Sequence, residues 1–378
     1  MDGDGDASIV CDRGAIEAGP YRTLDLTVTT TDDQADLNPG DGVCSTVSST
    51  CSLRAAIQES NEGVGPRDIE LGSAQTYTLT LNGSSEDAGA TGDLDVRAPM
   101  RMHGHGSTIA RTMTDRALHV QTGGALLIES TAFSSSPIQV DIRASAQLWD
   151  LTLTGTTVSA WGPLDVRRTS VSSSGIGTSA NALIVESSFS GSSCLSASGT
   201  GKVVTVQRST FLGCTTPISV AGSRLTLENS TIGESGTSTG GAVGVSIGGQ
   251  LDVVSSTLTA NLGMPFRIAQ GSTGTITVTS SIVAMQQNGA VDCFSPIVSG
   301  GYNLFSSASC SGAVASDLLG ANPQLAAVGN NGGLTLTYLP DVGSPAIDSS
   351  APSVCLPTDQ RGTVRPQGAA CDRGAVEQ

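Results

Sequence analysis

The chain has 378 residues and a formal net charge of −16, with 34 Asp and Glu residues against 18 Lys and Arg residues. This acidity argues against nucleic acid and anionic membranes as partners, because both favour basic surfaces. Aromatic residues make up only 3% and no apolar run is long enough to span a bilayer, so we expect neither membrane insertion nor a compact core of large side chains.

The chain begins with an acidic segment that offers candidate calcium ligands. Asp2, Asp4 and Asp6 alternate with glycine, and carboxylates in short Gly-rich loops suit Ca²⁺. A full EF-hand loop would need Glu at its twelfth position, where Arg13 stands, so a flexible acidic linker is the alternative. A second candidate calcium loop contains Asp36, Asn38 and Asp41. No other cofactor is expected.

Residues 51–63, CSLRAAIQESNEG, are predicted to form a short capping helix. Ser52 can serve as its N-cap, while Leu53, Ala56 and Ile57 fall on one helical face. A solenoid leaves open sheet ends, and a helix of this kind can cover one of them.

From about residue 100 to residue 320 the sequence repeats a phrase of one or two Ser/Thr residues followed by a large apolar residue. The phrases end at Phe133, Leu153, Val171, Phe189, Phe211, Ile232, Leu258 and Ile282. Alternating segments such as ALLIE, RLTLE and TITVT precede them and predict short strands. Spacings of 18 to 26 residues are typical of a solenoid, so we predict an all-β, single parallel β-helix. A β-sandwich is the competing fold, but it lacks so long a repeat.

The nine cysteines favour four local disulfides in an oxidising compartment, with unpaired buried thiols as the alternative. The predicted pairs are Cys44–Cys51, Cys194–Cys214, Cys293–Cys310 and Cys355–Cys371. Cys11 is left over.

Two segments carry a resemblance to a known family. LTVTTTDDQADLNPGDGVCSTVSSTCSLRAAIQESN resembles the CSLREA domain of bacterial surface β-helix proteins, with Ala55, expected at an exposed helix position, where the family has Glu. Residues 84–96 resemble that family's first rungs. ANPQLAAVGNNGGLTLTYLPDVGSPAIDSS and TDQRGTVRPQGAACDRGAVE resemble the choice-of-anchor Q region. The resemblance implies a right-handed β-helix that is secreted or on a bacterial cell surface.

The expected organisation has four parts. Residues 1–20 form a tail-like segment or linker, 21–99 the N-terminal cap and first rungs, 100–320 the coils, and 321–378 the C-terminal region stapled by a disulfide.

A seven-residue phrase occurs twice. Residues 11–17 read CDRGAIE and residues 371–377 read CDRGAVE. In the resembled family this phrase closes a module, so residues 1–20 are interpreted as the tail of another module. The candidate docking residues, which would contact another copy or a neighbouring module head to tail, are Cys11, Asp12, Arg13, Gly14, Ile16 and Glu17. A leftover linker is the alternative.

Catalytic signals are weak. Residues 102–106, MHGHG, resemble a Gly-His-Gly of β-helix pectin hydrolases, but no Asn-Thr-Asp occurs and the adjacent pair Asp32-Asp33 lies upstream of the coils; a sharp turn is the plainer interpretation. A polysaccharide lyase would use Asp and Arg residues, for which Asp141-Ile142-Arg143, Asp150 and the segment from Asp165 to Arg168 are candidates. The alternative for these is a solvated ladder of ion pairs.

The sequence therefore predicts an extracellular structural or adhesive β-helix module, not an enzyme, that works in a tandem array or filament. A polysaccharide-active enzyme or a carbohydrate-binding β-helix is the alternative, with cell-surface polysaccharide as a candidate partner.

Overall fold

The computed structural model describes residues 25–63, 67–83, 86–141, 143–237, 241–287 and 291–378. The chain divides into two compact units, Met1–Asp165 and Val166–Gln378. No helix in the described ranges is long and apolar enough to cross a membrane.

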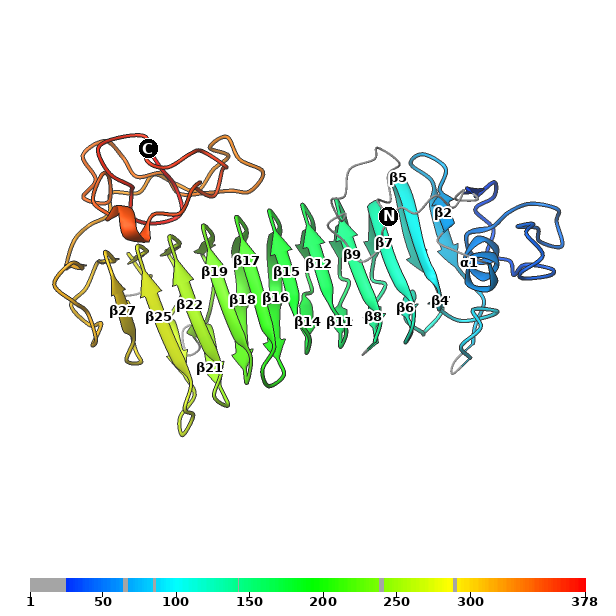
Figure 1. Cartoon of the computed structure of the whole chain (residues 1–378), viewed down its shortest axis with the longest axis horizontal. Helices are drawn as coiled ribbons and strands as arrows, with labels where there is room; N and C mark the ends of the chain where they lie inside the picture. Colours follow the sequence, from blue (N-terminus) through cyan, green and yellow to red (C-terminus); the bar gives the residue numbers. More distant parts are fainter. Residues whose placement is uncertain (1–24, 64–66, 84–85, 142, 238–240, 288–290) are drawn as a thin grey trace, which may run out of the picture. The chain divides into compact units, whose positions relative to one another are not determined.

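The described residues of unit 1 form short parallel strands and the helix α1, which packs against β2 and β4 (Figure 1). Its elements are β1 (Leu26–Thr27), α1 (Leu53–Glu62), β2 (Arg67–Glu70), β3 (Thr76–Leu79), β4 (Leu94–Val96), β5 (Pro99–Arg111), β6 (Leu118–Val120), β7 (Ala125–Ser134), β8 (Ile138–Val140), β9 (Ser145–Trp149), β10 (Thr152–Thr154) and β11 (Val158–Ala160). The strands pair in three columns, β2–β5–β7–β9, β3–β5–β7–β10 and β4–β6–β8–β11. β12 (Leu164–Arg167) spans the division between the units.

Unit 2 repeats this arrangement. Its elements are β13 (Ser170–Ser172), β14 (Ile176–Thr178), β15 (Ala182–Val185), β16 (Ser188–Ser198), β17 (Val203–Gln207), β18 (Thr210–Ala221), β19 (Arg224–Glu228), β20 (Thr231–Gly233), β21 (Gly241–Ser246), β22 (Gln250–Val254), β23 (Thr257–Thr259), β24 (Met264–Ile268), β25 (Thr275–Thr279), β26 (Ile282–Ala284), β27 (Val298–Gly301), β28 (Leu304–Phe305), β29 (Leu318–Leu319) and the 3₁₀ turn η1 (Pro352–Val354). The columns are β15–β17–β19–β22–β25–β27, β14–β16–β18–β21–β24 and β13–β16–β18–β20–β23–β26–β28–β29. The predicted parallel β-solenoid is confirmed in both units.

The large apolar residues of the repeated phrase stack inside the coils. In unit 2, Val171 pairs with Phe189, which pairs with Phe211; Ile232 and Leu258 continue the row. The rings of Phe189 and Phe211 are parallel, with centroids 4.6 Å apart. These side chains are almost completely buried, so each coil contributes one large residue to a continuous core.

The predicted last member of this row is wrong by one residue. Leu258 pairs with Val283, while Ile282 pairs with Thr257. Because side chains alternate between the two faces of a strand, Val283 occupies the internal row and Ile282 faces outward. Ile282 is nevertheless buried, because Ala346 of the C-terminal region packs with it.

The serine of each phrase forms a buried polar ladder next to the apolar row. Ser209 N–H donates to Ser230 Oγ, Ser230 N–H to Ser256 Oγ, and Ser256 N–H to Ser281 Oγ, each at 3.1 Å. Asn303 Oδ1 ends the ladder by accepting from Ser281 N–H at 3.0 Å. The repeated serines therefore satisfy backbone groups that the corner between two strand columns would otherwise leave unpaired.

Helix α1 is confirmed, with Ser52 Oγ accepting from Ala55 N–H at 3.0 Å. The expected exposure of Ala55 is wrong, since Ala55 is completely buried. The segment before the helix lies against it: Asp36 N–H donates to Gln58 Oε1 at 2.8 Å, and Gly42 N–H donates to Glu59 Oε1 at 2.8 Å. A small residue at position 55 fits a helix that is covered on both sides.

All four predicted disulfides are present, namely Cys44–Cys51, Cys194–Cys214, Cys293–Cys310 and Cys355–Cys371.

Candidate functional site

The C-terminal region of unit 2 folds back along the coils that precede it (Figure 1, orange to red). It lies over a row of threonines, Thr210, Thr231 and Thr257, which pair across β18, β20 and β23. Thr210 Oγ donates to the carbonyl of Leu336 at 2.6 Å, and Thr231 Oγ donates to Gln360 Oε1 at 2.7 Å. The three threonines are at most 2% exposed, so their outward hydroxyls are covered by the C-terminal region.

We call residues 371–377, CDRGAVE, the clasp; all seven are buried. Its backbone bonds to the coils: Gly374 N–H donates to the carbonyl of Ser280 at 2.8 Å, and Ala375 N–H donates to Thr257 Oγ at 3.0 Å. Arg373 donates to the carbonyls of Asn303 at 2.6 Å and of Ser316 at 3.1 Å. The clasp thus joins the C-terminal end to several successive coils.

Glycine is required at position 374. The residue has φ +93°, and a Cβ there would lie 2.7 Å from Ile282 Cδ1 and 2.8 Å from Thr257 Oγ. A side chain would therefore be strained by the backbone and would clash with the coil surface.

The loops before the clasp bind its two carboxylates, one through an ion pair and one through a backbone N–H group. Arg365 Nη1 donates to Glu377 Oε2 at 2.8 Å with both side chains fully buried, and Asp348 N–H donates to Asp372 Oδ1 at 2.7 Å. We give the name seat to seven of the clasp's partners on the coils and in these loops, namely Thr257, Ser280, Asn303, Ser316, Asp348, Asp359 and Arg365. Buried charges are tolerated only when they are paired, so the seat and the clasp depend on each other.

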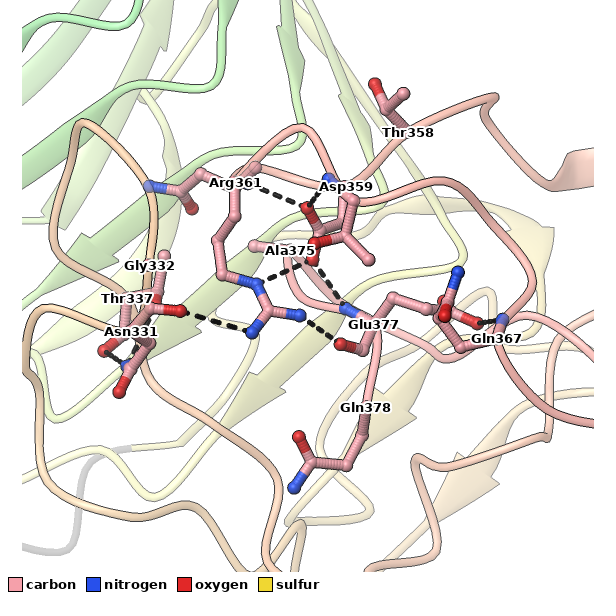
Figure 2. Close-up of polar contacts among 12 residues, drawn as sticks. Asn331, Gly332, Thr337, Thr358, Asp359, Arg361, Gln367, Ala375, Glu377 and Gln378 are labelled. Carbon is pink, nitrogen blue, oxygen red and sulfur yellow. Dashed lines mark hydrogen bonds and ion pairs between the residues drawn. The ribbon is translucent and has the colours of Figure 1, made fainter.

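Arg361 and Asp359 hold the end of the clasp. Figure 2 shows the Arg361 guanidinium directed at Asp359, at the carbonyl of Asn331 and at the carbonyl of Glu377. Glu377 N–H donates to Asp359 Oδ2 at 3.0 Å. The last residues of the phrase are therefore bonded through both backbone and side chains.

Burial raises the pKa of Asp372 to about 6, and the neighbouring Glu377 carboxylate adds to the effect. Burial also lowers the pKa of Arg365, against the opposing effect of Glu377, Asp359 and Asp372.

The predicted docking residues Cys11, Asp12, Arg13, Gly14, Ile16 and Glu17 lie outside the described residues, as do the candidate calcium ligands Asp2, Asp4 and Asp6. The structure describes the contacts of the second copy of this phrase, residues 371–377.

The candidate calcium loop of Asp36, Asn38 and Asp41 is closed by its own backbone. Asp36 accepts from the N–H groups of Asn38 and Ser45, and Asp41 accepts from Val43 N–H. Burial raises the pKa of Asp36, although these two bonds oppose the shift. The carboxylates therefore fix the loop, and a calcium role stays a prediction.

The predicted turn in MHGHG lies inside β5, where the strand register shifts between His103 and Ser107. His105 and Gly106 both have positive φ values there. His103 and His105 both approach Glu70, whose carboxylate lies 2.7 Å from His105 Nε2. Asp33 accepts from Arg54 Nε at 2.6 Å and from the backbone of residues 80 and 81, so it ties α1 to the coils.

A polar surface that sequence reasoning missed lies on the outer face of β4, β6, β8 and β11 in unit 1. Asp95, His119, Gln139 and Ser159 occupy equivalent positions in four successive coils. The positions two residues further along each coil are also aligned; they are Arg97, Gln121, Asp141 and Trp161. The N–H groups of the last three donate to the carbonyls of Val96, Val120 and Val140 in the preceding coils. We call these eight positions the polar face.

His119 lies between two carboxylates at the centre of the polar face. Its Nδ1 is 3.2 Å from Asp95 Oδ1 and its Nε2 is 3.1 Å from Asp141 Oδ2, while Arg116 Nη2 is 2.9 Å from Nδ1. Burial lowers the pKa of His119, but the bonds to the two carboxylates outweigh burial and the Arg116 charge, so the pKa lies above the ordinary histidine value. Each ring nitrogen thus lies within hydrogen-bond distance of one carboxylate, and Nδ1 also lies beside the Arg116 guanidinium.

Asp87, Asp95 and His119 place ligand atoms within 4.8 Å of one another, a spacing that a metal ion could use. The Asp95 oxygens, however, already accept from Gln121 Nε2 at 2.6 Å and from Gly89 N–H at 3.1 Å. Arg116 adds a cation beside them, so these residues do not favour a metal ion.

The suggested charge ladder of Asp141 and Asp165 is wrong for these two residues. Ala160 pairs with Val140, so Trp161 is the residue one coil along from Asp141. Residue 142 lies outside the described residues.

No protein-family model matches the sequence, and no curated protein matches it. Among solved structures, the chain is similar to the crystal structure of pectate lyase Pel9A, with a TM-score of 0.43 and 14% identity over 95% of this chain and 98% of that chain. A similarity this distant assigns no activity.

The polar face was missed because its residues are far apart in sequence and belong to no local motif. A signal was present, since Asp95, His119, Gln139 and Ser159 follow one another at spacings of 24, 20 and 20 residues. Polar residues at the solenoid period line up on one surface.

Proposed function

We propose that the protein is an extracellular structural β-solenoid module that works in an array, and that each copy of the CDRGA phrase closes one solenoid of that array. The observation that supports this is the burial of the whole clasp, with Arg373 bonded to carbonyls of the seat and Glu377 paired with Arg365. Four disulfides support an oxidising, extracellular location. The resemblance to surface β-helix proteins at the two ends of the sequence is part of this proposal.

The first copy of the phrase carries the same chemistry as the clasp. Residues 11–17 have Cys, Asp, Arg, Gly, Ala and Glu where residues 371–377 have them, and Ile16 replaces the buried Val376. In the clasp, Arg373 and Glu377 depend on the carbonyls and on Arg365 of the seat. Residues 11–17 therefore fit a seat of this kind on a neighbouring solenoid module.

A seat is open to residues 11–17 only where its own clasp is absent. The clasp of the same chain has an effective concentration in the millimolar range or above, because it is joined to the seat by a short connection. Within one intact chain residues 371–377 should keep the seat, and residues 11–17 should serve a neighbour.

This proposal is tested with a labelled peptide of residues 8–20, carrying Cys11→Ser, and a full-length chain with Gly374→Ala and Arg13→Ala. Gly374→Ala should weaken the contact between the clasp and the seat. Arg13→Ala removes the arginine of the chain's own first copy, so that this copy does not compete with the peptide. Fluorescence anisotropy should show saturable binding to this variant and at least tenfold weaker binding to the wild-type chain.

A peptide that also carries Arg13→Ala is the matched control and should bind at least tenfold more weakly. Gly271→Ala controls for backbone strain, since Gly271 has φ +77° but no atom lies within 4 Å of the point that an added Cβ would occupy. Equal binding of the two peptides, or no binding to the loosened chain, would contradict the proposal.

A polysaccharide-cleaving activity is not proposed. Both ring nitrogens of His119 lie within hydrogen-bond distance of a carboxylate, so neither is free to act as a base on a ligand.

A further inference from the structure

A shallow pocket of about 370 Å³ opens on the polar face and is lined by Thr122, Gln139, Asp141 and Trp161. Its volume lies in the range of small-ligand sites. Trp161 is 43% exposed, which is unusual for so large a side chain in a protein with few aromatic residues. An exposed indole beside polar groups suits a ligand with one apolar face and several hydroxyls.

The polar groups of the pocket are held in place by the coils around it. Gln139 Nε2 donates to Asp141 Oδ1 at 3.0 Å, and Gln139 Oε1 accepts from Arg116 Nη1 at 2.9 Å. Asp141 Oδ2 lies 3.1 Å from His119 Nε2. These bonds fix the carboxylate of Asp141 before any ligand arrives, which reduces the ordering cost of binding.

The carboxylate of Asp141 in the pocket selects against an anionic ligand. Burial raises the pKa of Asp141, but its bonds to Gln139 and His119 lower it overall, so Asp141 is ionised. Asp87 and Asp95 add carboxylates nearby, while Arg116 is already bonded to Asp93. An ionised carboxylate accepts hydrogen bonds from hydroxyl groups and repels a uronic acid.

A peptide strand is also disfavoured. The strands under the pocket pair with neighbouring coils on both sides, β6 with β4 and β8, and β8 with β6 and β11. An added strand needs a free sheet edge, whereas this surface is a sheet face.

We infer that the pocket of Thr122, Gln139, Asp141 and Trp161 binds an uncharged saccharide, with the sugar ring stacked on Trp161 and its hydroxyls bonded to Asp141 and Gln139. Asp141 and Trp161 occupy equivalent positions one strand spacing apart, about 4.8 Å, so one sugar unit can contact both side chains. This inference does not depend on the proposed role of the clasp.

The test is native gel electrophoresis of the full chain in gels that contain a neutral polysaccharide (a β-glucan, a xylan, a mannan or dextran) or polygalacturonate. At least one neutral polysaccharide should retard the wild-type chain, and polygalacturonate should not. Trp161→Ala should weaken retardation at least tenfold, and Asp141→Asn by a factor of about three to ten.

Phe294→Ala is the matched control, since Phe294 is 59% exposed and belongs to unit 2; it should bind as the wild type does. The two tryptophans of the chain allow a second measurement, because Trp149→Phe leaves Trp161 as the only indole reporter in a fluorescence titration. Absence of retardation by all four neutral polysaccharides, preference for polygalacturonate, or unchanged binding by Trp161→Ala would each overturn the inference. None of these results bears on peptide binding to the seat.

Discussion

His119 shows how the solenoid concentrates charge at single residues. The residue is 6% exposed, yet its ring lies between Asp95 and Asp141, with Arg116 on one side and Asp93 beside that arginine. Burial alone would favour the neutral ring, and the two carboxylates reverse this preference.

The raised pKa of His119 predicts a pH-dependent stability. Its contribution to the free energy of unfolding is fully present below the ordinary histidine pKa and is lost as pH rises through the raised folded-state pKa. Urea midpoints measured from pH 5 to pH 9 should fall over this window in the wild type and fall less in His119→Gln. Identical profiles for both chains would contradict the assignment.

At the scale of the element, the repeated phrase has two separable roles. Its apolar residue fills the interior, and its serine carries the ladder that joins one coil to the next. Ser230 accepts from Ser209 N–H, and its own hydroxyl donates to the carbonyl of Glu228 at 2.7 Å. Removing this hydroxyl leaves a buried N–H without its acceptor.

Ser230→Ala should therefore lower the free energy of unfolding by about 1–3 kcal/mol. Ser192→Ala, at an exposed position of β16, is the control and should change it by less than about 0.5 kcal/mol. Thermal or urea unfolding followed by circular dichroism measures both. Equal small effects would mean that the ladder contributes little.

The period of the phrase predicted the solenoid because each coil must present the same residue types at the same corner. The disulfide pairs could be predicted because cysteines that are close in sequence lie on the same coil or on adjacent coils. Ile282 was misplaced because its neighbour Val283 is equally apolar; the strand pairing and the bond from Ser256 N–H to Ser281 Oγ show the true register. Ala55 was misjudged because the segment that covers α1 is itself irregular.

The polar face and the seat could not be predicted from local motifs. Both are made by residues from several coils, so their positions depend on exact coil lengths and on how the C-terminal region folds back. Gln360, for example, bonds to Thr210 and Thr231 across about 130–150 residues of sequence. The clasp phrase itself was visible in the sequence, but its partners were not.

At the scale of the whole molecule, the proposed array requires that both copies of the CDRGA phrase fit the same kind of seat. The intact chain cannot report this directly, because Cys371 is already bonded to Cys355. Cys371→Ser leaves Cys355 unpaired beside the seat, and Gly374→Ala loosens the clasp so that the seat can open. A first copy docked in that seat would bring Cys11 next to Cys355.

The most direct measurement is therefore disulfide mapping of the full-length chain with Cys371→Ser and Gly374→Ala after oxidation with glutathione disulfide, which is reduced to two glutathione molecules as each protein disulfide forms. Mixed ¹⁴N and ¹⁵N chains identify links between copies by mass spectrometry. We expect a Cys11–Cys355 link between copies that is lost when Arg13→Ala is added. Glutathione-capped Cys11 and Cys355, or links that persist with Arg13→Ala, would contradict the claim.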